Sequence, residues 1–166
     1  MFIVIPIWTY TIRRFILTTV TIRVPAKFAS FYDDRSVKVF DARRGTYLST
    51  FGDMKSVVGQ SVDAMTDATL HQPHGLCCDS RGNVIVCDTG NRRVVMFSHD
   101  GRFLTNLLLP PGGTTAGRRT GRGTKGVLKA CPIDVDISQS GDRLALTLHE
   151  QNSSFRKLVV YDFDQS

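Results

Sequence analysis

The chain is poor in cysteine and lacks the spacings that most cysteine chemistry requires. Its 166 residues include four cysteines, and no two of them show the CxxC spacing of a zinc knuckle or a thioredoxin-like redox pair. Three of the four lie within apolar runs, where a thiol packs as a small hydrophobic side chain. We therefore expect reduced, buried cysteines, which favours a cytosolic or nuclear setting, and we predict a cytoplasmic protein. The cysteines are Cys77, Cys78, Cys87 and Cys131.

The apolar N-terminus contains no uncharged stretch of membrane-spanning length. Its longest such stretch runs from Met1 to Ile12, whereas a spanning helix needs about 18 residues. Pro6 interrupts this stretch, and Arg13 and Arg14 follow it rather than precede it, unlike the charges of a secretory signal. We predict β-strand here, with a targeting segment as the minor alternative, and no association with a membrane.

Motifs of catalysis and of cofactor binding are also missing. The sequence has no GxSxG nucleophile elbow and no GxxxxGK[ST] phosphate loop, and the string GRGTKG has the wrong spacing for one. His71 and His74 form an HxxH pair, but Pro73 between them disfavours the helix that would bring both rings to one metal ion. We expect no enzymatic activity, no cofactor and no metal, while a zinc-dependent lyase stays open as a minor alternative.

What the sequence does contain is an internal repeat. The segment DDRSVKVF, which ends at Phe40, matches GNRRVVMF, which ends 57 residues later at Phe97. PHGLCCDSRG, from Pro73, matches PIDVDISQSG, from Pro132, in the separation of its proline and glycine. Short apolar strands that recur at a long period, with turn residues and no helical periodicity between them, are typical of a β-propeller.

These repeats predict the organisation of the chain. We expect an all-β fold, a partial β-propeller of about three four-stranded antiparallel blades, in a single domain over residues 1–166. A hydrophobic fraction of 42% and a charged fraction of 22% suit a globular protein of this length. The expected blades cover residues 15–52, 73–109 and 130–164, and the expected inter-blade loops cover residues 53–72 and 110–129.

The best-formed unit resembles an NHL repeat. The matching positions are Pro73, Gly75, Asp79, Gly82, Asn83, Asp88, Asn91, Arg92 and Phe97. The resemblance implies a β-propeller, commonly of six blades, such as the C-terminal region of TRIM-NHL ubiquitin ligases, which binds protein substrates or RNA. Because three units are about half of a six-bladed ring, the resemblance also implies that this chain lacks further blades, so we expect a fragment. The cysteine and histidine pattern of a RING domain is absent from this sequence, so ligase activity would belong to a longer parent protein.

Two groups of basic residues are candidates for binding. In the stretch from Asp88 to Arg93, we expect Asp88 and Asn91 to hold a hairpin turn and Arg92 to pair with an acidic neighbour or cross the blade surface. Arg93 has no evident duty in the turn, so we expect it to project toward a phosphate or a carboxylate. The second group lies among glycines, without acids, as in flexible segments that contact RNA phosphates; it comprises Arg118, Arg119, Arg122 and Lys125. Protein binding is the leading hypothesis and RNA binding the alternative.

Overall fold

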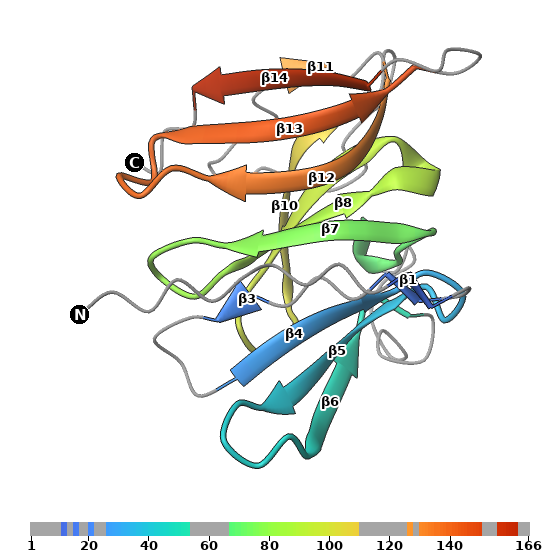
Figure 1. The fold of residues 1–166 in the computed structure, drawn as a ribbon, viewed down its shortest axis with the longest axis vertical. Helices are drawn as coiled ribbons and strands as arrows, with labels where there is room; N and C mark the ends of the chain where they lie inside the picture. The colour runs from blue at the N-terminus through green and yellow to red at the C-terminus, as the bar shows by residue number, and fades with distance from the viewer. Residues whose placement is uncertain are drawn as a thin grey trace.

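Three β-sheets lie one above another in the computed structural model (Figure 1). The structure describes residues 11–12, 15–16, 20–21, 26–53, 67–109, 126–127, 130–150 and 156–162. The first sheet has the order β3-β4-β5-β6, the second β11-β10-β9-β8-β7 and the third β12-β13-β14, and a separate pair joins β1 to β2. The first elements are β1 (Thr11–Ile12), β2 (Phe15–Ile16), β3 (Val20–Thr21), β4 (Ala26–Phe31), β5 (Ser36–Asp41) and β6 (Tyr47–Phe51).

The second sheet is the meander that the best-formed repeat predicts. Its strands β7 to β10 follow one another along the chain and pair antiparallel. One further strand, β11, pairs parallel to β10, although its residues fall within the expected inter-blade loop 110–129. The strands are β7 (Pro73–Cys78), β8 (Val84–Asp88), β9 (Arg93–Phe97), β10 (Phe103–Leu109) and β11 (Gly126–Val127).

Asp79, Gly82 and Asn83 together hold the turn between β7 and β8. The carboxylate of Asp79 accepts hydrogen bonds from the backbone N–H groups of Arg81 at 2.9 Å and Asn83 at 2.8 Å, and from the Asn83 amide at 2.7 Å. Gly82 has a φ of 85°, a conformation that a side chain would strain. The carboxylate thus satisfies the backbone donors that the tight reversal leaves without strand partners.

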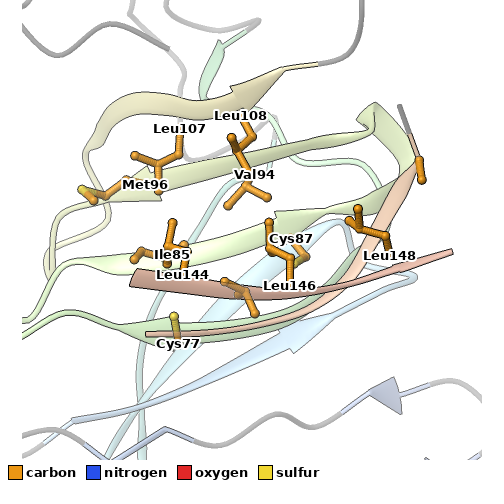
Figure 2. Packing of buried hydrophobic residues seen from close by; sticks show 12 residues of the cluster. Cys77, Ile85, Cys87, Val94, Met96, Leu107, Leu108, Leu144, Leu146 and Leu148 are labelled. Atoms are coloured by element: carbon orange, nitrogen blue, oxygen red, sulfur yellow. The ribbon is translucent and has the colours of Figure 1, made fainter. Parts of the chain in front are cut away.

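The second sheet is buried on both of its faces. All residues of β8 and β9 are buried, and successive side chains enter two different clusters, as strand geometry requires. One cluster joins Ile85, Cys87 and Val94 to leucines of the third sheet (Figure 2). The other joins Val84, Val86, Val95 and Phe97 to the first sheet through Phe28, Val37 and Phe51. Burial on both faces by neighbouring sheets is the packing expected of a blade inside a propeller.

The third sheet contains β12 (Cys131–Ile137), β13 (Arg143–His149) and β14 (Arg156–Asp162). Its first strand, β12, lies against β7, and the approach is close: a Cβ atom at Gly75 would lie 2.5 Å from the Cα atom of Asp134. The glycine of the motif is therefore a packing requirement between two sheets. Nowhere in the described ranges is there a helix of the length and hydrophobicity that a bilayer crossing demands.

Candidate recognition surface

Asp88 organises the turn between β8 and β9 and ties it to the chain that precedes the sheet. Its side chain is fully buried and accepts hydrogen bonds from the backbone N–H of His71 at 2.7 Å, the amide of Asn91 at 2.8 Å and Nε of Arg93 at 2.6 Å. The backbone N–H of Gly90 donates to the carbonyl oxygen of His71 at 2.8 Å. The motif residues Asp88 and Asn91 therefore use their polar atoms to hold the fold.

Arg93 is buried beside Asp88 rather than projecting from a face, which differs from the sequence expectation. Only 7% of the residue is exposed. Its guanidinium donates to Oδ1 of Asn106 at 3.2 Å and to the carbonyl oxygen of Thr69 at 2.8 Å, and it lies 3.9 Å from a carboxylate oxygen of Asp67. Burial of a guanidinium is costly unless hydrogen bonds and opposite charges surround it. Here the 67–71 segment and the second sheet both supply such groups. Arg93 thus joins the 67–71 segment to the second sheet.

Arg92 is the arginine of this pair that reaches solvent. It has a left-handed backbone with a φ of 51°, and its N–H donates to the carbonyl oxygen of Thr89 at 3.0 Å, which closes a short 3-10 turn (Thr89–Asn91). Its side chain is exposed and takes part in no ion pair among the described residues. The other expected binding residues, Arg118, Arg119, Arg122 and Lys125, lie outside the described residues.

His71 and His74 are held by separate parts of the structure. His74 lies in β7, where its ring packs edge-on against Tyr32 with a centroid distance of 5.2 Å. Burial, together with the charge of Arg156, lowers the pKa of His74. His71 lies before β7 and donates its backbone N–H to Asp88. Within the part of the chain that the structure describes, no three His, Cys, Asp or Glu side chains come together as metal ligands.

The cysteines pack as core residues. Burial raises the pKa values of the Cys77 and Cys87 thiols well above their usual range and raises that of Cys78 to about 12. A thiol becomes a nucleophile or a metal ligand only as the thiolate, so these environments disfavour both roles. The half-buried Cys131 is also free of disulfide bonds.

We expect Cys77 and Cys87 to resist alkylation in the folded chain because they are 3% and 0% exposed and hold their protons. Iodoacetamide at neutral pH, followed by peptide mass spectrometry, should modify both only after denaturation. Rapid labelling of either thiol in a chain with native circular dichroism would contradict this packing.

The hairpin of β5 and β6 carries exposed aromatic, apolar and basic side chains. Tyr47 and Leu48 are 57% and 54% exposed, and they are two of the four large hydrophobic residues that are exposed in the described part of the chain. Tyr47 packs edge-on against the half-buried Phe40 at a centroid distance of 6.1 Å, and Arg43 and Arg44 occupy the turn. We call Phe40, Arg43, Arg44, Tyr47 and Leu48 the β5–β6 surface; in Figure 1 this hairpin lies at the lower end of the stack.

Hydrogen bonds fix the shape of the β5–β6 surface. The carboxylate of Asp41 accepts the backbone N–H groups of Arg43 at 2.8 Å and Arg44 at 2.7 Å, and these bonds lower the pKa of Asp41. The carboxylate is thus occupied with the backbone, and neither guanidinium forms an ion pair within the described ranges. The hydroxyl groups of Tyr47 and Thr50 lie 2.9 Å apart. The surface therefore presents the hydrogen-bonded ring of Tyr47 and the guanidinium groups of Arg43 and Arg44, which form no ion pair in the described ranges.

Comparison with known proteins identifies part of the chain. The family model of the NHL repeat matches residues 70–97. The curated protein lin-41 of Caenorhabditis elegans is 35% identical over 65 residues, which are 39% of this chain and 6% of that protein. The chain thus spans a small fraction of this relative's length.

Two solved structures with a similar backbone fold over part of their length are named as enzymes. A streptogramin B lyase is 14% identical with a TM-score of 0.48, over 89% of this chain and 40% of that one. The hydrazine synthase of Kuenenia stuttgartiensis is 18% identical with a TM-score of 0.48, over 87% and 45% of the two chains. Residues 70–97, which match the NHL repeat, supply strands β7, β8 and β9 of the central blade in a partial β-propeller of three sheets.

Proposed function

We propose that this chain is a non-catalytic recognition module that binds a protein partner through the β5–β6 surface. The observation that carries the proposal is the exposure of Tyr47 and Leu48 beside two arginines without ion-pair partners in the described part of the chain. Tyrosine and arginine are enriched in protein interfaces and dominate their binding energy. An exposed hairpin suits a protein surface better than a small substrate, which needs a concave pocket.

The distribution of polar groups in the central blade supports a role in binding rather than catalysis. The motif side chains Asp79 and Asp88, and the neighbouring Arg93, are buried and hydrogen-bonded to other parts of the structure. General acid, base and nucleophilic catalysis need such groups to face a substrate. We infer that the motif builds the scaffold and that the partner is a substrate of a TRIM-NHL-like ubiquitin ligase to which the module belongs.

RNA binding is a second candidate because Arg92 is exposed and unpaired among the described residues. Arg118, Arg119, Arg122 and Lys125 would add phosphate contacts from the glycine-rich segment. Binding of this kind is dominated by phosphate contacts, so its affinity would fall steeply as salt rises. The buried Arg93 would take no part in it.

We expect a variant with Tyr47→Ser and Leu48→Ser to capture its partner at least about tenfold less strongly than the natural chain, because each change removes a potential anchor of the interface. The measurement is quantitative affinity capture from nuclease-treated lysate, with titration of the captured protein. A matched control is the double variant Arg81→Ser and Arg102→Ser, which changes exposed residues of other turns.

Capture that is lost in the first variant and kept in the control supports the β5–β6 surface. Equal capture by both variants would overturn it. Binding of a pool of short RNAs that falls with salt and with the triple variant Arg118→Ala, Arg119→Ala and Arg122→Ala, without any protein capture, would favour the second candidate.

A further inference from the structure

Strand β7 of the second sheet contacts both of the neighbouring sheets. It lies between β4 of the first sheet and β12 of the third (Figure 1). On the side of the first sheet, the hydroxyl of Ser30 donates a hydrogen bond to the carbonyl oxygen of His74 at 2.5 Å. On the side of the third sheet, Gly75 lies so close to Asp134 that a Cβ atom would not fit between them. His74 therefore lies at the junction of three sheets.

The ring of His74 has an aromatic partner but no ion-pair partner among the described residues. It packs against the ring of Tyr32, which follows β4, with a centroid distance of 5.2 Å and an angle of 82° between the ring planes. The side chain is half-buried, and no carboxylate of the described chain is paired with it. A neutral imidazole suits such surroundings, whereas an imidazolium would carry a charge that is partly removed from water.

The charged groups around this junction do not compensate a positive charge on His74. Burial, and to a smaller extent the charge of Arg156 in β14, lowers the pKa of His74. The carboxylate of Asp88 in β8 is already occupied by hydrogen bonds from other residues. The remaining titratable side chains on the elements that contact β7, and on the turn after β4, form no ion pair with His74; they are Lys27, Asp33, Asp34, Arg35, Cys87, Cys131, Asp134 and Asp136.

We propose that His74 is a proton-sensitive contact between two sheets: protonation of its ring in mild acid weakens the packing of the first sheet on the second. The charged ring is partly desolvated while it packs against Tyr32 and regains water when this contact opens, so acid favours the open contact. Because the pKa of His74 is lowered in the folded chain, its contribution to stability is fully present above about pH 6.5, the usual value for histidine. The contribution is lost as the pH falls through the pKa of the folded chain.

Urea denaturation at a series of pH values from about 7.5 to about 5, followed by circular dichroism, tests this contact. The natural chain should lose more stability over this range than His74→Phe, which keeps a ring against Tyr32 but cannot be protonated. His99→Phe is the matched control, because His99 is exposed in the turn before β10 and its replacement should leave the pH dependence of the natural chain unchanged. Equal pH dependence in the natural chain and in His74→Phe would overturn the proposal.

An NMR titration of the natural chain with isotope-labelled histidine tests the same contact without relying on the stability of a variant. The signal of the His74 ring, assigned by its loss in His74→Gln, should titrate with a midpoint below about pH 6.5. Nuclear Overhauser effects between the rings of His74 and Tyr32 should weaken with the same midpoint, because protonation opens the contact. A midpoint at or above the usual histidine value, or ring-to-ring effects that stay constant through the titration, would contradict the proposed role of His74.

Discussion

Replacement of Arg93 by leucine is expected to lower the free energy of unfolding by about 3–5 kcal/mol. The change removes the guanidinium partner of the fully buried Asp88 carboxylate and removes the Arg93 hydrogen bonds to Oδ1 of Asn106 and to the carbonyl oxygen of Thr69. A buried charge that loses its ionic partner costs far more than the loss of an exposed ion pair. Urea denaturation followed by circular dichroism measures the difference.

The neighbouring arginine provides the control. Arg92→Leu changes an exposed side chain with no ion pair in the described part of the chain, so its effect should stay within about 0.5 kcal/mol. Equal losses of stability in the two variants would show that Arg93 does not have the buried, compensated position described here.

Replacement of Phe97 by alanine should also cost about 3–5 kcal/mol, because it opens a cavity between two sheets. Phe97 is fully buried, with its ring centroid 4.9 Å from that of Phe51 in the first sheet and 5.9 Å from that of Phe103 in the second. The surrounding aromatic rings come from different sheets and cannot all move inward to fill the space. Tyr47→Ala is the matched control, since Tyr47 is 57% exposed. A loss for Phe97→Ala no larger than for Tyr47→Ala would contradict this packing.

The internal repeat was sufficient to predict the fold class. Alternating apolar strands and the turn residues around Asp79 and Gly82 act locally, so a single sequence reveals them, and the predicted all-β architecture is confirmed. The added strand β11 was not predictable, because Gly126 and Val127 pair with residues of β10 that precede them by 18 positions, and their sequence has no strand pattern of its own.

Whether Arg92 or Arg93 is buried depends on the register of β8 and β9, which the sequence shows only indirectly. Asp88 and Arg93 are directly paired across β8 and β9, so their side chains lie on the same face at the buried end of the hairpin. The available signal was an acid and a base, Asp88 and Arg93, on either side of a four-residue turn. The pairing of Asp88 with Arg93 was missed because the sequence is equally compatible with Arg92 as the partner of an acidic residue.

The β5–β6 surface could not be found from sequence for a different reason. Tyr47 and Leu48 follow the same apolar pattern as the buried strands, and the pattern does not show which face a neighbouring sheet covers. In the structure, Phe51 at the far end of β6 is 3% exposed against the second sheet, while Tyr47 and Leu48 at its start are not covered by any sheet of the described chain. Exposure in this case follows from tertiary packing.

Hydroxyl-radical footprinting of the chain, alone and with its captured protein partner, tests the recognition role most directly. The exposed side chains of Tyr47 and Leu48 should oxidise readily in the free chain and be protected in the complex, while the buried Phe97 should be unreactive in both. Unchanged oxidation of Tyr47 and Leu48 in a saturated complex would contradict the proposed interface and place the partner on another part of the chain.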